Sequence, residues 1–257
     1  MILTHATGAS YFQFEHLADF PEIAHGVFTR SPGHSEPPFD RLNISLSVGD
    51  DPGRVARNRG LVADCLGAAA LASARQVHGS DVVVVDGRPA ASPPVGDALV
   101  TRHAGTFLMI AAADCQAILM YDPRRRVVAG IHSGWRGSVA DIAGRAVAVM
   151  RERFGCRPSD IRAGVGPSLG PCCAEFVHYR TEIPEALWGY RRDGDRFDFW
   201  AMTRDQLTRS GVPDAHIETS GICTRCRTDL FFSHRGEKRT GRFPAVIGIK
   251  KVLSVKF

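Results

Sequence analysis

Hydrophobic and polar residues form two kinds of pattern along this chain. Short apolar runs bounded by turn residues predict strands, and longer segments with apolar residues three or four positions apart predict helices. Both patterns continue without an internal repeat or a linker, which favours one α+β domain over residues 1–257. The predicted strands are residues 24–29, 44–48, 81–85, 98–100, 107–111, 116–121, 126–131 and 243–249; the predicted helices are residues 53–66 and 138–154, the second capped by Ser138; residues 86–96 are a predicted surface loop.

The two apolar runs on either side of residues 122–125 predict a β-hairpin, because a polar, Pro-containing stretch between such runs is typical of a tight connection. With a four-residue loop, Tyr121 pairs with Arg126, and Cys115 lies directly opposite His132. Opposed residues in an antiparallel pair have Cβ atoms about 5 Å apart on one face of the sheet. The pattern therefore predicts that this thiol and this imidazole are close enough to share a metal ion, whereas a slip of one residue would separate them.

His78 is the third candidate ligand, and it must come from another strand. Two imidazoles and a thiolate can hold a zinc ion and leave the fourth coordination position to water or substrate. Each residue also has a simpler interpretation, Cys115 as a small buried hydrophobic residue and His78 and His132 as hydrogen-bonded structural groups. The residues by themselves leave both interpretations open.

The charge of the chain limits the choice of partners. The formal net charge is +5 and the isoelectric point is about 9.0, but the basic residues are dispersed among acidic ones. The chain shows no recognised nucleic-acid motif, so we expect no nucleic-acid partner. A mild positive field favours small anionic substrates such as phosphate.

The apolar runs and the cysteines indicate the compartment. No apolar run is long enough to span a bilayer, and the N-terminus lacks the basic start and hydrophobic block of a secretory signal, so we expect a cytoplasmic protein. The seven cysteines are scattered and odd in number, which suits reduced thiols better than a disulfide framework.

Three further segments that contain glycines or cysteines each have a functional and a purely structural interpretation. The glycines of residues 133–137, with Arg136 and a helix start, could hold an anion beside the proposed metal, or could form a simple strand-to-helix turn. In the Gly/Pro-rich segment 163–173, Cys172 or Cys173 could line a pocket or act as a nucleophile, or both could be buried thiols in a rigid loop. The pair Cys223 and Cys226 has the spacing of half a zinc ribbon, but no second pair follows, which predicts a loop without a metal or redox role.

Several motifs, in order, resemble the YfiH-type family, and the match runs from about Leu42 almost to Phe257. This family has been labelled multicopper polyphenol oxidase or laccase-domain protein, and it is described as purine nucleoside phosphorylase with adenosine deaminase activity. The motifs are Gln76-Val-His-Gly79, Gly96-Asp-Ala98, Ala113-Asp-Cys115, Gly130-Ile-His-Ser-Gly-Trp-Arg-Gly137, Gly164-Val-Gly-Pro-Ser-Leu-Gly-Pro-Cys172, Asp229-Leu-Phe-Phe-Ser-His-Arg235 and Thr240-Gly-Arg242.

The resemblance implies a fold and a metal site. The fold is a four-layer α/β/β/α sandwich with mixed sheets, in a protein that we expect to be a monomer or a weak homo-oligomer. The resemblance also implies a zinc ion bound by two histidines and one cysteine, at positions that match the three candidate ligands, with copper as a possible alternative metal. We add four candidate contacts to phosphate or nucleoside: Asn43, Arg75, Arg136 and Cys172.

The implied reaction is phosphorolysis of adenosine, inosine, guanosine or methylthioadenosine to a free purine and a ribose 1-phosphate. Zinc could orient phosphate or a sugar oxygen, and it could also serve a deamination of adenosine, although the usual zinc deaminase signature is absent. Two alternatives are a copper-dependent polyphenol oxidase and a cysteine hydrolase, such as an amidase that edits peptidoglycan precursors, with Cys115 as nucleophile. The isolated histidines do not favour the trinuclear copper cluster of a true multicopper oxidase.

Overall fold

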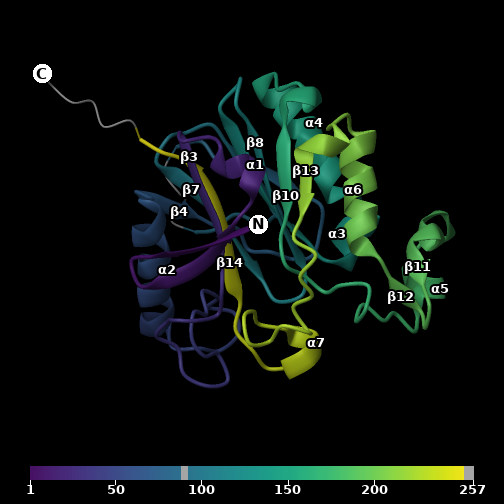
Figure 1. Cartoon of the computed structure of the whole chain (residues 1–257), viewed down its shortest axis with the longest axis horizontal. Helices are drawn as coiled ribbons and strands as arrows, with labels where there is room; N and C mark the ends of the chain where they lie inside the picture. Colours follow the sequence, from purple (N-terminus) through teal and green to yellow (C-terminus); the bar gives the residue numbers. More distant parts are fainter. Residues whose placement is uncertain (88–91, 252–257) are drawn as a thin grey trace, which may run out of the picture.

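Two six-stranded mixed sheets form the centre of the computed structural model, which describes residues 1–87 and 92–251 (Figure 1). The order in the first sheet is β1 (Ile2–Ala6), β2 (Ala9–Gln13), β3 (Ile23–Phe28), β14 (Phe243–Ile249), β7 (Thr106–Ala112) and β4 (Ala70–Ala72). The order in the second sheet is β13 (Ile217–Thr219), β10 (Arg162–Val165), β8 (Gln116–Asp122), β9 (Val127–Ser133), β6 (Ala98–Thr101) and β5 (Val82–Val84). A separate hairpin joins β11 (Arg191–Arg192) to β12 (Arg196–Phe197).

Helices cover the outer faces of the two sheets. Helix α2 (Pro52–Leu66) buries Val62 and Leu66 against Phe107 and Val246 of the first sheet. Helices α4 (Ile142–Phe154) and α6 (Phe199–Arg209) pack on the second sheet, and Figure 1 shows them on the side of the molecule opposite α2. The shorter helices are α1 (Glu15–Ala18), α3 (Trp135–Val139), α5 (Tyr179–Glu182) and α7 (His234–Glu237), and the 3₁₀ turns are η1 (Pro158–Asp160), η2 (Glu185–Tyr190) and η3 (Asp214–His216).

The main core lies between the inner faces of the two sheets. Leu108 and Ile247 of the first sheet belong to the same buried cluster as Leu119 and Val128 of the second. Burial of each aliphatic side chain of this kind contributes about 2 kcal/mol of transfer free energy. The packing of the two sheets against each other therefore fixes the positions of their strand ends. The predicted combination of helices and mixed sheets is confirmed. Among the described residues, none of the helices has both the length and the apolar character of a membrane span.

The predicted strand at residues 44–48 is wrong, because this segment is irregular. The side chain of Asn43 accepts a hydrogen bond from the N–H of Ser45 and donates one to the carbonyl of Ser45. Such local bonds compete with the ladder of a sheet. Of the predicted loop 86–96, residues 88–91 lie outside the described residues, and the remainder carries no strand beyond an isolated bridge at Val95.

The predicted helix at residues 138–154 is in fact two helices. Helix α3 ends at Val139, and α4 begins at Ile142 after Asp141, whose φ is 54°. The carboxylate of Asp141 caps α4 by accepting the N–H of Gly144 at 3.0 Å. Ser138 is therefore not the N-cap; it lies buried inside α3, with its hydroxyl 3.0 Å from that of Ser133.

The predicted hairpin forms, but its register differs by two residues. Asp122 pairs with Val127, so the loop is residues 123–126, and Ala117 rather than Cys115 lies opposite His132. The Asp122 carboxylate accepts two backbone N–H groups of this loop, which favours the tighter start of the turn. A shift of two residues keeps every side chain on its original face, so Cys115 and His132 remain on one face as diagonal neighbours.

Candidate active site

His78, Cys115 and His132 converge at one end of the second sheet. His132 lies on β9, Cys115 precedes β8, and His78 lies in the loop between β4 and β5. Their ligand atoms all lie within 4.8 Å of one another, and the two imidazole rings are nearly perpendicular, with centroids 4.9 Å apart. Two nitrogen donors and one sulfur donor match the ligands of a zinc ion with an open position, so this His₂Cys group could bind a metal.

Asp97, which precedes β6, holds both histidines. Its carboxylate accepts a hydrogen bond from Nδ1 of His132 at 2.8 Å, which leaves Nε2 of that ring as the available donor to a metal. The same carboxylate accepts the backbone N–H groups of Val77, His78 and Gly79 at 3.1, 2.9 and 2.8 Å. These bonds hold His78 in a left-handed conformation, with φ 59°, that side chains with a Cβ rarely adopt. Burial opposes ionisation of Asp97, but its hydrogen bonds with His132 and the backbone lower its pKa.

The thiol and the imidazole of this group shift each other's pKa. Burial raises the pKa of a thiol, but the positive charge and hydrogen bonds of His132 and His78 lower the pKa of Cys115 to about 6. Burial lowers the pKa of an imidazole, but Cys115 and Asp97 together raise the pKa of His132 to about 9. The surroundings therefore favour the thiolate, which is the form that binds metal ions or acts as a nucleophile.

Gly134 leaves room for these side chains. A Cβ placed on Gly134 would lie 2.9 Å from Cδ2 of His78 and 3.1 Å from Sγ of Cys115. Gly134 has an extended conformation, with φ −76°, so the requirement for glycine comes from close approach and not from backbone freedom.

Asp114 anchors the backbone next to Cys115. Its own backbone is left-handed, with φ 88°. Its carboxylate accepts hydrogen bonds from the hydroxyl groups of Thr224 and Ser233, both at 2.7 Å, and from the N–H of Arg235 at 2.5 Å. Three bonds from segments more than 100 residues away therefore fix the position of the thiol.

A cavity of about 670 Å³ opens beside the His₂Cys group. Its walls include all three potential ligands, apolar and aromatic side chains, and several arginines. This volume is within the usual range for small-molecule sites. Its aromatic residues are Trp135, Phe176 and Phe199, and its arginines are Arg59, Arg75, Arg235 and Arg242.

Arg59 and Arg242 supply positive charge from partly buried positions in the cavity wall. Burial lowers the pKa of each guanidinium, which shows that each charge is partly removed from water. Arg59 donates to the carbonyl of Ile44, and Arg242 donates to the carbonyls of Thr240 and Gly241. Within residues 1–87 and 92–251, neither side chain forms an ion pair with a carboxylate. This part of the cavity is therefore suited to an anion.

The four candidate substrate contacts have different positions. Arg75 lines the cavity. Asn43 is fully buried and is not a wall residue; its side chain bonds to Ser45, Asp50 and the N–H of Arg242. Arg136 is exposed, and its guanidinium stacks 4.2 Å from the centre of the Trp135 ring, outside the described wall of the cavity. Cys172 lies in another cluster of side chains, and all seven cysteines are free thiols in this structure.

Cys223 and Cys226 lie in a loop, as predicted, but they do not lie alone. A second pair of cysteines lies beside them, Cys172 and Cys173, which precede them in the chain. The four sulfurs lie within 4.8 Å of one another, so this Cys₄ group could also bind a metal. Asp97 was not predicted as a site residue, although it lies in the motif Gly96-Asp-Ala98. Arg59 was not predicted either, because no local pattern distinguishes it from the other arginines of α2.

Comparison with known proteins identifies relatives over nearly the whole chain. A family model described as multi-copper polyphenol oxidoreductase laccase matches residues 24–250. A protein of Geobacillus stearothermophilus named purine nucleoside phosphorylase YlmD is 36% identical over 243 residues, covering 87% of this chain and 89% of the relative. A purine nucleoside phosphorylase of Streptomyces coelicolor is 38% identical over 237 residues, covering 87% of this chain and 95% of the relative.

Solved structures show the same architecture. The crystal structure of YlmD from Geobacillus stearothermophilus superposes with a TM-score of 0.86 at 33% identity, covering 96% of this chain and 98% of that one. The structure of a hypothetical protein YfiH of Bacillus licheniformis superposes with a TM-score of 0.84 at 31% identity, covering 95% and 97%. The chain therefore has a YfiH-like fold, with helices and two six-stranded mixed sheets.

Proposed function

The chain belongs to the family described as multi-copper polyphenol oxidoreductase laccase, and we propose that it is a purine nucleoside phosphorylase whose metal ion is held by His78, Cys115 and His132. The observation that carries this proposal is that one cavity joins the His₂Cys group to the guanidinium groups of Arg59 and Arg242, which have no carboxylate partner among the described residues. The names of the curated relatives support the same activity.

Phosphorolysis exchanges one bond at C1′ of the ribose for another. A phosphate oxygen forms a bond to C1′, the bond from C1′ to the purine nitrogen breaks, and its electron pair leaves with the base, which gains a proton. A zinc ion in the His₂Cys group would supply Lewis-acid stabilisation of an oxygen of phosphate or sugar. Arg59 and Arg242 hold the phosphate dianion by charge-assisted hydrogen bonds and reduce the cost of bringing it to the sugar. Arg75, an exposed residue of the cavity wall, assists them in binding the phosphate.

The aromatic part of the wall fits the base. Phe176 packs edge-on against Trp135 and Phe199, with ring centroids 6.1 and 5.2 Å apart. Such a surface accepts a flat purine and excludes water from the breaking bond. We therefore expect the purine to pack against these aromatic side chains and the phosphate to contact the arginines of the same cavity.

The test is to incubate zinc-loaded protein with adenosine or inosine, with and without phosphate, and to separate the products by chromatography. We expect free adenine or hypoxanthine together with ribose 1-phosphate, only when phosphate is present. Inosine formed from adenosine without phosphate would reveal the deaminase activity that we propose as a second reaction of the same site. Absence of base release from all four nucleosides, including guanosine and methylthioadenosine, would contradict the phosphorylase proposal.

A copper-dependent phenol oxidase is a second candidate, because the family description names it and two imidazoles with a thiolate can also bind copper. Within the described residues, the metal-competent groups are one His₂Cys group and one Cys₄ group, and neither resembles a three-copper cluster built from paired histidines. Phenol turnover that rises with copper occupancy, with no base release from nucleosides, would favour the oxidase.

A cysteine hydrolase or amidase is a third candidate, because Cys115, His132 and Asp97 follow the order of nucleophile, base and orienting carboxylate. The two classes respond oppositely to a chelator. A zinc enzyme loses activity when a chelator removes its metal. A thiol hydrolase gains activity under the same treatment, because a bound metal blocks the thiolate that acts as its nucleophile.

A further inference from the structure

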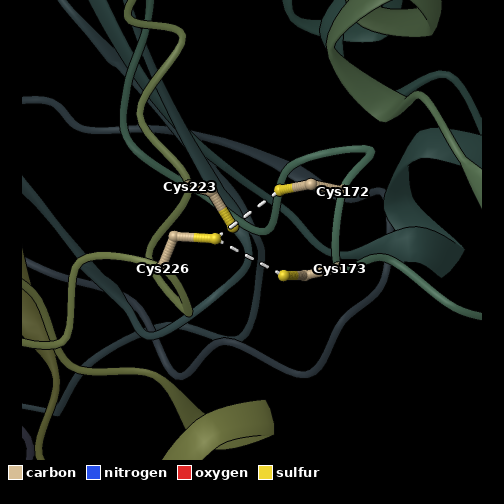
Figure 2. A group of neighbouring side chains, drawn as sticks. All are labelled: Cys172, Cys173, Cys223 and Cys226. Atoms are coloured by element: carbon tan, nitrogen blue, oxygen red, sulfur yellow. Dashed lines mark hydrogen bonds between the residues drawn. The ribbon is translucent and has the colours of Figure 1, made fainter.

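Four cysteines form a cluster that is separate from the His₂Cys group, and none of them is among the described residues of the cavity wall. Figure 2 shows their side chains pointing toward one another from two loops, one between β10 and α5 and the other between β13 and α7. We propose that this Cys₄ group is a second metal site, a closed tetrathiolate zinc site that ties the two loops together. Its members are Cys172, Cys173, Cys223 and Cys226.

The distances between the sulfur atoms suit one tetrahedral ion. Sγ of Cys226 lies 3.7 Å from Sγ of Cys172 and 3.6 Å from Sγ of Cys173. Four sulfurs bonded to one tetrahedral zinc ion at about 2.3 Å are about 3.8 Å apart. A disulfide would require about 2.05 Å between sulfurs and joins only two of them. The observed spacing therefore needs little rearrangement to accept an ion at its centre.

Hydrogen bonds of the main chain hold the two loops together and position the sulfurs. Ser168 donates its N–H to the carbonyl of Ile222, and Thr224 donates its N–H to the carbonyl of Ser168. The N–H of Gly170 lies 3.3 Å from Sγ of the buried Cys223 and donates to it. An N–H donor to sulfur stabilises the thiolate form that a metal requires.

The charges around the cluster suit a metal–thiolate centre. Four thiolates around one dication carry two net negative charges. The guanidinium of Arg196 donates to the carbonyl of Cys172, and that of Arg235 donates to the carbonyl of Cys173. Two cationic side chains are thus held against the backbone of the ligands, where they offset the negative charge.

The connection to Asp114 gives the cluster a structural role. Leu169, next to the first loop's cysteines, donates its N–H to the carbonyl of Asp114 at 2.8 Å. Thr224, between the cysteines of the second loop, donates its hydroxyl to the carboxylate of Asp114 at 2.7 Å. Both loops therefore hold the residue that precedes Cys115. With four protein sulfurs, the site has no position left for substrate, which is typical of structural zinc.

Zinc content and sulfur coordination of the purified full chain test this proposal. We expect about two zinc ions per wild-type chain by elemental analysis, and about one in each of Cys172→Ser and Cys226→Ser. Both substituted side chains are exposed, so neither variant opens a cavity in the core. X-ray absorption at the zinc edge should show fewer zinc–sulfur contacts per ion in both variants, and the unfolding temperature should fall by several degrees.

Two controls separate this site from the His₂Cys group. Cys65→Ser removes a partly exposed thiol outside both groups and should leave zinc content and unfolding temperature unchanged. His132→Ala should lose the other zinc ion and keep the sulfur-rich spectrum. An equal zinc content in wild type, Cys172→Ser and Cys226→Ser would overturn the proposal, as would native protein whose intact mass shows these cysteines paired in disulfides. Neither outcome depends on phosphorylase activity.

Discussion

Both metal-competent groups contain cysteine sulfur, but they differ in the number of donor atoms and in their surroundings. The His₂Cys group has three donors from three segments and borders a cavity of about 670 Å³. The Cys₄ group has four donors from two loops, and none of its cysteines lines that cavity within the described part of the chain. In zinc proteins, a vacant coordination position next to a cavity, and not the presence of cysteine, distinguishes a catalytic site from a structural one.

Removing one donor from each group should separate activity from stability. His132→Ala should lower phosphate-dependent turnover by roughly 10²–10³-fold, because a ligand and the Asp97 hydrogen bond are both lost. Its unfolding temperature should change less than that of Cys226→Ser. Rates of base release and thermal unfolding of the two variants check this. Similar losses of activity in both variants would show that the two groups do not have separate roles.

Asp97→Asn tests whether the orienting carboxylate belongs to the metal site. The side chain keeps its size but loses its charge and one acceptor for the His132 imidazole and the backbone of His78. We expect zinc affinity of the His₂Cys group to fall by roughly 10–100-fold. Competition with a chromogenic chelator measures this change. The zinc of the Cys₄ group, followed in the same titration, should keep its affinity.

Arg242→Met removes one guanidinium from the cavity wall and keeps much of the apolar stem. We expect KM for phosphate to rise roughly tenfold, since a charge-assisted hydrogen bond contributes about 1.5 kcal/mol or more. Arg136→Met is the matched control, because Arg136 stacks on Trp135 outside the described wall. Steady-state kinetics with varied phosphate measure both. An equal change of KM for phosphate in the two variants would contradict the proposal that Arg242 binds phosphate.

Gly134→Ala should crowd the His₂Cys group without altering the Cys₄ group. The added methyl group meets His78 and Cys115 at 2.9 and 3.1 Å, and overpacking of this kind costs about 1 kcal/mol, or about fivefold in zinc affinity. Gly60→Ala is the control, because open space surrounds that position on α2. Unchanged affinity in Gly134→Ala would mean that the ligands of the metal-bound state lie elsewhere.

The pH dependence of thiol reactivity compares the two groups without a mutation. In protein freed of metal, the pKa of Cys115 is lowered to about 6, so its side chain is mostly a thiolate at pH 7 and becomes a protonated thiol as the pH falls below 6. Burial and neighbouring thiols raise the pKa of Cys172 and Cys173, which remain protonated at pH 7. Alkylation at pH 7, read by peptide mass spectrometry, should therefore label Cys115 before these two. Labelling of Cys172 or Cys173 first would contradict the electrostatic difference.

The sequence predicted local elements better than relations between them. The predictions of strands β7 and β14 are confirmed. Both strands are buried on both faces and therefore have long apolar runs that are recognisable in the sequence. The proximity of Cys115 and His132 was predicted from a register that is wrong by two residues, and it survived because strand faces repeat every two residues. The resemblance to the YfiH-type family is confirmed, whereas the single domain and the roles of the site residues stay predictions.

Contacts between distant segments explain what could not be predicted. The Cys₄ group joins residues about 50 positions apart, and neither Cys172 nor Cys226 carries a local signal of the other. Asn43 was expected at the substrate, and the structure shows its amide bonded to the backbone of Ser45, a contact that the sequence did not indicate. Arg59 lies on a helix with several arginines, and only the packing of α2 shows which of them reaches the cavity.

The most direct test of the central claim is phosphorolysis measured as zinc is returned to chelated protein. Ribose 1-phosphate formed from inosine and phosphate can be followed by ³¹P magnetic resonance in wild type and in His132→Ala. We predict that product formation rises with zinc occupancy in wild type and stays near background in His132→Ala at every zinc concentration. Full phosphate-dependent turnover in His132→Ala, or in wild type before any zinc is added, would contradict the account.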